Sequence, residues 1–205
     1  MEDYIIKGDA YSIFITNIQS VDVESNSIYL SKEEKEKLSI YFSDKRKIEF
    51  SSVRYLLKKY IGDYTIEYDG LGAPNIIDGP NISISHSHKY VAIAQSNKNR
   101  IGIDIEKIKE KIQKITTKFI NLEDLKNITS EENELNETTY TKIWCCKEAI
   151  YKILSNKKIG LKEHITIKLS SPYTATAFVN FENTIHSFYI NIHYLDDYII
   201  AAVVK

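Results

Sequence analysis

Cysteine, glycine and proline are all scarce in this chain, and long apolar runs are missing. The two cysteines, Cys145 and Cys146, are neighbours, a spacing that suits neither a disulfide framework nor a metal site. Seven glycines and three prolines predict a compact chain with few long loops. The longest clearly apolar run, Tyr198 to Val204, is far shorter than the ~20 residues that cross a bilayer. Residues 1–12 also lack the basic and apolar regions of a signal peptide. We therefore expect a reducing, cytoplasmic location and no membrane partner.

An excess of positive charge is missing as well. The chain has 27 lysines and arginines against 28 aspartates and glutamates, which gives a net charge of −1. Because nucleic-acid-binding domains usually carry a clear basic excess, this balance argues against a dedicated nucleic-acid binder. The 43% hydrophobic and 27% charged content is typical of a globular protein, and 205 residues can form one large domain or two small ones.

The order of the expected elements predicts an α+β fold with two halves of similar plan, at residues 1–100 and 101–205. In the first half we expect strands at 11–16, 65–68, 82–84 and 90–94, with helices at 31–42 and 44–61. In the second half we expect a strand at 100–105, helical pieces over 107–136, a helix over 138–154, and strands at 164–169, 174–179, 188–194 and 198–204. Ser31 and Glu34 form a capping box, and Asp44 is predicted to cap the second helix. The turn-rich residues 96–99 predict a hairpin between strands 90–94 and 100–105.

Two acids alternate with isoleucines in the sequence GIDIE at residues 102–106. On a strand, Ile103 and Ile105 would enter the core, while Asp104 and Glu106 would share the other face, ~6.5–7 Å apart at Cα. Two carboxylates in that arrangement suit a hard cation. The alternative is a half-solvated strand edge without a ligand.

A second group of polar residues lies on the predicted helix 138–154. Trp144, Glu148 and Lys152 are four residues apart and therefore share one helix face. These residues could serve a site, or Glu148 and Lys152 could form a surface ion pair beside a core tryptophan.

The sequence SISHS at residues 83–87 lies at the end of a predicted strand. Its hydroxyls and imidazole could hold a phosphate, or they could only cap a turn. A catalytic Ser-His-Asp triad is disfavoured, because the side chains of Ser85 and His86 diverge on a strand and no nucleophile-elbow glycine pattern surrounds the serine.

Taken together, a serine-histidine-serine turn, then GIDIE, then WCCKEA at residues 144–149 resembles the 4′-phosphopantetheinyl transferases. The order and spacing of the motifs and the chain length are similar to the monomeric, surfactin-synthetase-activating subclass. The resemblance implies a pseudo-dimer of two similar α/β subdomains with the active site at their interface. It also implies transfer of the 4′-phosphopantetheine group of coenzyme A to a serine of an apo acyl or peptidyl carrier protein, with release of 3′,5′-ADP.

The resemblance implies that Asp104, Glu106 and Glu148 are the ligands of Mg²⁺. Lys152 would lie near the phosphates and stabilise the leaving group, so Glu148 and Lys152 are the catalytic candidates. The proton of the attacking serine could pass to Glu148, to a metal-bound water or to Lys147.

The coenzyme A contacts are implied by the same resemblance. Ser85 and His86 would hold the 3′-phosphate end, Arg54 follows an F-x-x-x-R pattern, and Lys37 lies where the family often has a basic phosphate-binding side chain. One departure concerns affinity: Ala73 stands where the family commonly has a lysine, so weaker or differently arranged coenzyme A binding is expected. A second is the glycine-rich segment after the helix, which keeps a single glycine within residues 152–161.

Three other functions remain open at this point. A non-catalytic homologue would bind coenzyme A or a carrier protein without transferring anything. A metal-dependent phosphohydrolase would use the same acids with water as the nucleophile. A structural protein would use Trp144 and the cysteines as core and leave the acids solvated.

Overall fold

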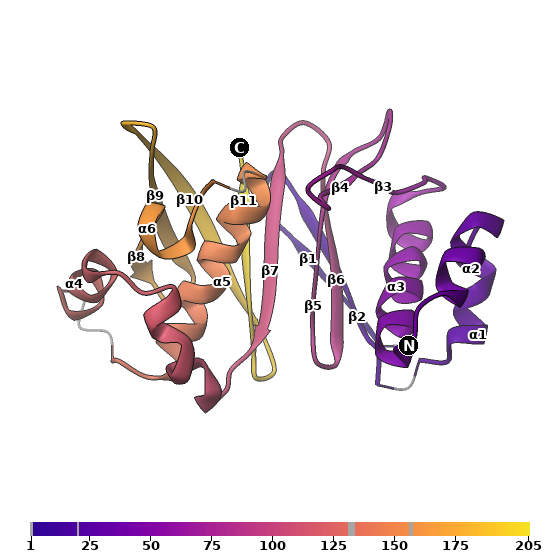
Figure 1. The fold of residues 1–205 in the computed structure, drawn as a ribbon, viewed down its shortest axis with the longest axis horizontal. Coiled ribbons are helices and arrows are strands. Elements are labelled where there is room, and N and C mark those ends of the chain that lie inside the picture. The colour runs from indigo at the N-terminus through magenta and orange to yellow at the C-terminus, as the bar shows by residue number, and fades with distance from the viewer. Residues whose placement is uncertain (1, 20, 131–133, 156–157) are drawn as a thin grey trace.

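The computed structural model describes residues 2–19, 21–130, 134–155 and 158–205. Its main elements are two antiparallel sheets, each with a helix packed on one face (Figure 1). The mixture of helices and sheets confirms the predicted α+β class. All strands of the four-stranded sheet precede residue 97, and all strands of the five-stranded sheet follow residue 100.

The four-stranded sheet has the order β1-β2-β6-β5. Its central strands β2 and β6 are apolar and buried on both faces, and one of these faces packs against helix α3. The first strand, β1, was not expected from the sequence. The strands are β1 (Asp3–Lys7), β2 (Ser12–Asn17), β5 (Asn81–Ser87) and β6 (Tyr90–Ser96), and the short strands β3 (Glu67–Tyr68) and β4 (Pro74–Asn75) pair with each other beside them.

The helices of the first half begin at side-chain caps. Ser31 and Glu34 form the predicted capping box at the start of α2 (Lys32–Ser39). Helix α3 (Asp44–Leu56) is capped by Ser43, whose hydroxyl accepts from Arg46 N, so the prediction of Asp44 as the cap was wrong by one residue. Helix α1 (Val23–Asn26) and the short helices η1 (Ser27–Tyr29) and η2 (Leu57–Ile61) complete this half.

The five-stranded sheet has the order β7-β11-β10-β9-β8. Helix α5 (Glu137–Leu154) packs against it, as predicted for residues 138–154, and ends at Ser155 in the left-handed conformation. The other elements are β7 (Ile101–Lys107), η3 (Glu110–Lys118), α4 (Leu122–Ser130), α6 (Leu161–His164), β8 (Ile165–Ser171), β9 (Thr174–Phe181), β10 (Thr184–Leu195) and β11 (Tyr198–Val204).

The predicted hairpin between strands 90–94 and 100–105 was wrong. β6 pairs with β2 and β5, whereas β7 pairs with β11. The turn-rich residues 97–100 therefore carry the chain from one sheet to the other. Pairing with the distant β11 lets β7 bury both of its faces, which a two-stranded hairpin could not do.

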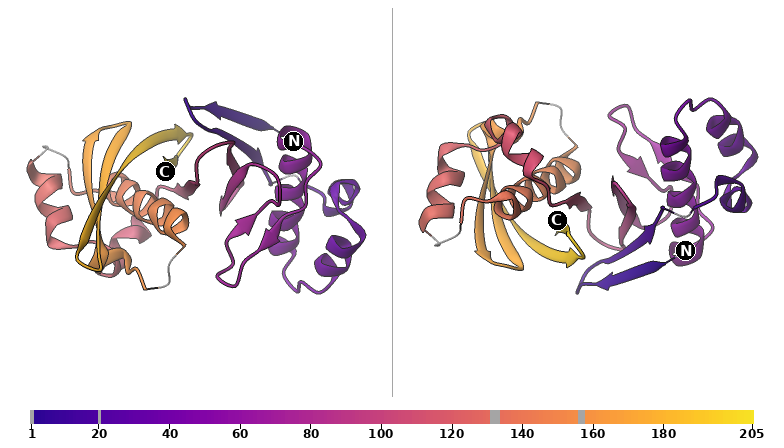
Figure 2. Two further views of the ribbon diagram at one scale, coloured as in Figure 1. Left: turned by 90° about the horizontal axis from the view of Figure 1, so that it is seen from above. Right: turned by 90° about the horizontal axis from the view of Figure 1, so that it is seen from below.

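Three buried apolar clusters hold the fold together. One lies between α3 and the first sheet, and a second lies between α5 and the second sheet. The third joins the two sheets and contains residues from β2, β6, β7 and β11, among them Ile13, Ile103 and Ile200. Figure 2 shows the two halves side by side from above and from below. None of the described helices is long and apolar enough to span a lipid bilayer.

Candidate active site

Strand β7 turns its two acids toward α5. Ile103 and Ile105 are fully buried in the cluster between the sheets, as the alternation predicts. Asp104 lies on the opposite face and is only 5% exposed. Gly102 shares this face, and a Cβ placed there would lie 2.2 Å from the carbonyl oxygen of Ala149 on α5. The absence of a side chain at 102 therefore lets the helix approach the strand closely enough to reach the acids.

Lys152 joins the helix to this strand. Its ammonium donates to Asp104 Oδ1 at 2.8 Å and to the Ile103 carbonyl at 2.9 Å. A lysine ammonium has three donors, so one is left for a ligand beside the helix. The other carboxylate oxygen, Asp104 Oδ2, is buried and has no hydrogen-bond partner among the described residues.

The charge of Asp104 lies close enough to raise the pKa of the other two acids. Burial, followed by the charge of Asp104, raises the pKa of Glu148 to about 7. Burial and the same charge also raise the pKa of Glu106, although hydrogen bonds from Ser87 and Trp144 partly oppose them. The site therefore holds more carboxylate charge than its single ion-paired lysine balances, and a cation would relieve this imbalance.

The described residues contain no group of three or more acids, histidines or cysteines already gathered around one point that could hold a metal. Mg²⁺ is usually held by one or two carboxylates together with substrate phosphates and waters, so a complete protein cage is not required. The unpartnered Asp104 Oδ2 and the crowded carboxylates fit such a partial site.

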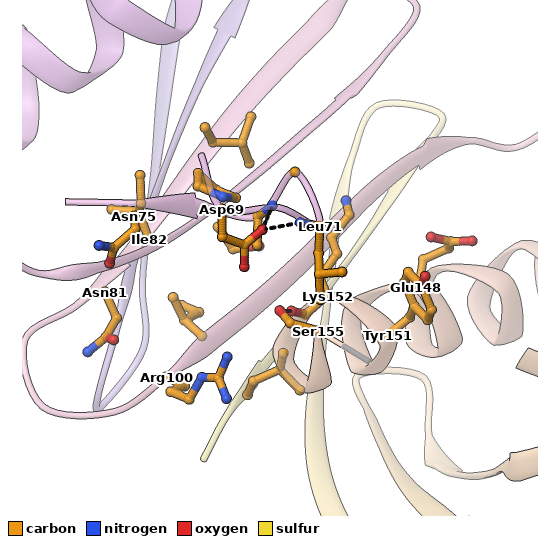
Figure 3. Close-up of a pocket in the computed structure, with 17 residues that line it drawn as sticks. Asp69, Leu71, Asn75, Asn81, Ile82, Arg100, Glu148, Tyr151, Lys152 and Ser155 are labelled. Carbon is orange, nitrogen blue, oxygen red and sulfur yellow. Dashed lines mark hydrogen bonds between the residues drawn. The ribbon is translucent and has the colours of Figure 1, made fainter. Parts of the chain in front are cut away.

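A cleft of about 470 Å³ lies beside these residues and between the two halves. It is lined by residues 69–75, by the start of β5 and by the C-terminal turns of α5, including Glu148 and Lys152 (Figure 3). Asp69 shapes one wall, because its carboxylate accepts from the amides of Leu71 and Ala73. The volume lies within the ~300–1,000 Å³ typical of small-molecule sites.

Arg100 is a cleft residue that the sequence analysis did not identify. It immediately precedes β7, and its backbone exchanges two hydrogen bonds with Lys205. Its side chain lines the same cleft as Ala73, the position where a lysine was expected. In the view of Figure 3, Lys152 is drawn between Arg100 and Glu148. The only signal in the sequence was the position of this arginine two residues before the GIDIE motif.

Ser85 and His86 point to opposite faces of β5. The Ser85 hydroxyl is buried against β7, where it contacts Asp104. The imidazole Nδ1 of His86 faces α3 and lies 3.2 Å from Glu49 Oε1. Burial lowers the pKa of His86, against the opposing charge of Glu49. The structure brings Ser85 to the acids of β7, and its role and that of His86 toward coenzyme A stay predictions.

Arg54 and Lys37 lie together in the first half. Arg54 is 2% exposed, donates to Glu34 Oε1 at 2.8 Å and stacks on the ring of Phe50. Lys37 lies over the ring of Tyr68, whose hydroxyl also accepts from Arg54. Neither residue is among the described residues that line the cleft. Their predicted contacts with coenzyme A also stay predictions.

Lys147 is enclosed in the second half. Its ammonium donates to Asp124 and to the carbonyls of Phe119, Leu161 and Ile165, and its side chain is fully buried. Burial lowers the pKa of Lys147. This geometry removes Lys147 from the candidates for the proton acceptor.

In the glycine-poor segment that follows α5, residues 156–157 lie outside the described residues.

Comparison with known proteins identifies the class of protein to which this fold and cleft belong. Residues 100–203, half of the chain, match the family model of the 4′-phosphopantetheinyl transferase superfamily. The chain therefore belongs to this superfamily of transferases. The matched segment includes β7 and α5, which supply both acids of the strand and the Glu148–Lys152 pair. A search of curated proteins gave no match.

Proposed function

We propose that this protein transfers the 4′-phosphopantetheine group of coenzyme A to a serine of an apo acyl or peptidyl carrier protein, as a Mg²⁺-dependent holo-carrier-protein synthase. One observation carries the proposal. The strand and helix within the superfamily match bring Asp104, Glu148 and Lys152 together at the edge of a cleft of about 470 Å³.

Coenzyme A would bind in this cleft with its diphosphate beside α5. The remaining ammonium donor of Lys152 would contact a diphosphate oxygen, and Arg100 would supply a second positive charge. Ala73 adds no charge to the cleft. The positive charge of Arg100 would therefore replace that of the lysine expected at position 73. Such binding would match the expectation, from the sequence, of weaker or differently arranged coenzyme A binding.

Asp104 and Glu148, together with Glu106, would hold Mg²⁺ at the side of the cleft. The bound cation would neutralise the diphosphate oxygens as charge builds on the leaving group. Asp104 is oriented for this task, because Ser85 and Lys152 fix one of its oxygens and leave the other unpartnered.

Transfer needs an acceptor for the proton of the carrier serine. Glu148 is half-buried, lines the cleft and is our first choice. The serine oxygen would form a bond to the phosphorus on the pantetheine side, and the bond from that phosphorus to 3′,5′-ADP would break. The serine proton would pass to the Glu148 carboxylate, while Lys152 stabilises the departing phosphate oxygen.

We further propose that the two halves form the pseudo-dimer of the surfactin-synthetase-activating subclass and that the protein acts as a cytoplasmic monomer. Two features support the pseudo-dimer. Each half has its own helix-on-sheet cluster, and a third cluster joins the sheets beside the cleft.

A carrier-modification assay tests the function. The protein is incubated with MgCl₂, coenzyme A and several apo carrier proteins, and each carrier is weighed by mass spectrometry. A mass gain of one phosphopantetheine group is expected, and EDTA should abolish it. Coenzyme A binding without any mass gain would instead indicate the non-catalytic homologue. Release of phosphate or pantetheine phosphate without a carrier would indicate a hydrolase.

A further inference from the structure

Three serines of β5 form a ladder of hydrogen bonds with the edge of β7. β5 is the edge strand of the first sheet, and β7 is the edge strand of the second. The amides of β7 that point away from β11 need acceptors, because an edge strand leaves alternate N–H groups unpaired. The hydroxyls of Ser83, Ser85 and Ser87 accept from the amides of residues 103, 105 and 107 at 3.1, 3.2 and 3.3 Å.

Two of these hydroxyls also donate to the acids of the site. Ser85 Oγ lies 2.8 Å from Asp104 Oδ1, and Ser87 Oγ lies 2.8 Å from Glu106 Oε2. A serine hydroxyl has one donor and two acceptor positions. Because the amide of β7 occupies an acceptor position, the single O–H is directed at the neighbouring carboxylate.

Ser83 provides a comparison within the same ladder. Its hydroxyl accepts from Ile103 N in the same way, but the residue at the equivalent place on β7 is Gly102, which has no carboxylate to receive the O–H. The three serines are similarly buried, at 4–6% exposure. Ser83 contacts no acid, and of the three serines it alone is among the described residues that line the cleft.

We propose that Ser85 and Ser87 are positioning residues, which hold Asp104 and Glu106 in the orientation that the transfer reaction needs. This role rests on the proposed function. Through these two serines the first half of the chain sets the geometry of acids that belong to the second half. Groups that orient the ligands of a metal in this way change its affinity or the activity by about 10- to 100-fold when removed.

The test compares Ser85→Ala and Ser87→Ala with the matched control Ser83→Ala. All three lose one bond of the ladder, and Ser85→Ala and Ser87→Ala also lose the bond to a carboxylate, so these two should lose at least as much thermal stability as Ser83→Ala. Ser85→Ala and Ser87→Ala should lower kcat in the carrier assay by about 10- to 100-fold. The same two should also lose the rise in melting temperature that MgCl₂ produces without coenzyme A or carrier. Ser85→Thr and Ser87→Thr keep the hydroxyl and should restore both properties.

The inference is overturned if MgCl₂ raises the melting temperature of the three alanine variants equally. It is also overturned if MgCl₂ raises the melting temperature of none of them. If Ser85→Ala does not fold, the comparison of Ser87→Ala with Ser83→Ala decides. A wild-type protein that modifies no carrier overturns the proposed function, and the positioning role is then judged on the MgCl₂ shifts alone.

Discussion

Glu148 and Lys152 lie one turn apart on α5, and both reach the cleft, but their surroundings differ. Lys152 is fixed by two hydrogen bonds to β7, whereas Glu148 is crowded by the charges of the β7 acids. A bound cation would therefore stabilise the charged form of Glu148. This difference supports our proposal that Lys152 stabilises the leaving group and that Glu148 accepts the proton.

Replacing Glu148 by glutamine should keep the fold and remove nearly all transfer. A neutral amide is a poorer ligand for Mg²⁺ and accepts no proton, so kcat should fall by about 10²- to 10⁴-fold. The measurement is the rate of carrier mass gain, with thermal melting as the check on folding. Glu123→Gln is the matched control, because Glu123 is exposed on α4 and pairs only with Lys126 among the described residues. Near-normal turnover of Glu148→Gln would remove this residue from the mechanism.

Arg100→Ala should weaken coenzyme A binding without changing the chemical step. Losing a charged contact to phosphate should raise KM for coenzyme A by about tenfold, which corresponds to ~1.4 kcal/mol, and leave kcat nearly unchanged. Lys98→Ala removes the same charge two residues earlier, beside a different hollow, and should have little effect. Adding Ala73→Lys to Arg100→Ala should restore part of the affinity. A fall in kcat with unchanged KM would contradict the role given to Arg100.

At the scale of elements, the site depends on how closely α5 approaches β7. Gly102 lies where a Cβ would meet the Ala149 carbonyl at 2.2 Å and Ile153 at 3.1 Å. The helix backbone cannot move away without also moving Glu148 and Lys152. The glycine of the GIDIE motif is thus a packing requirement of this strand–helix pair.

Gly102→Ala should therefore destabilise the protein by about 1–3 kcal/mol, the usual cost of overpacking a tight contact. Urea unfolding measures the change. Gly70→Ala is the matched control, because a Cβ at residue 70 meets nothing within 4 Å. Equal stability of the two variants would show that the close approach of α5 to β7 does not require glycine at residue 102.

At the scale of the whole molecule, the cluster between the sheets decides whether the halves act together. Ile200 of β11 is fully buried there against side chains of both sheets. The ladder of serines and the cleft both lie along the same boundary. A site built from both halves requires that they stay together under working conditions.

Ile200→Ala should cost about 2–5 kcal/mol, as for other large-to-small core changes, and both halves should still unfold in one transition. Fluorescence of Trp144, the single tryptophan, follows the second half during urea unfolding. Hydrogen exchange of peptides from β2 and β6 follows the first half under the same conditions. Loss of protection in β2 and β6 at lower urea than the tryptophan transition would show that the halves are independent.

The sequence alone determined the features that depend on neighbours along the chain. The Ser31 cap, the helix over 138–154 and the opposite faces of Ile103 and Asp104 follow from local periodicity and capping chemistry. These preferences persist in the fold because each element buries the face that its own pattern provides.

Only the tertiary structure decided which elements meet. The strand that pairs with β7 lies about ninety residues away in β11 instead of next to it in β6, so a turn signal could not reveal it. The place of Arg100 in the cleft and the contact of Ser85 with Asp104 follow from that pairing and from the packing of the two sheets. The burial of Lys147 follows from the packing of α5 against α4, α6 and β8. The physical reason is that such contacts depend on the burial and hydrogen-bonding needs of whole sheets, which no short segment of sequence contains.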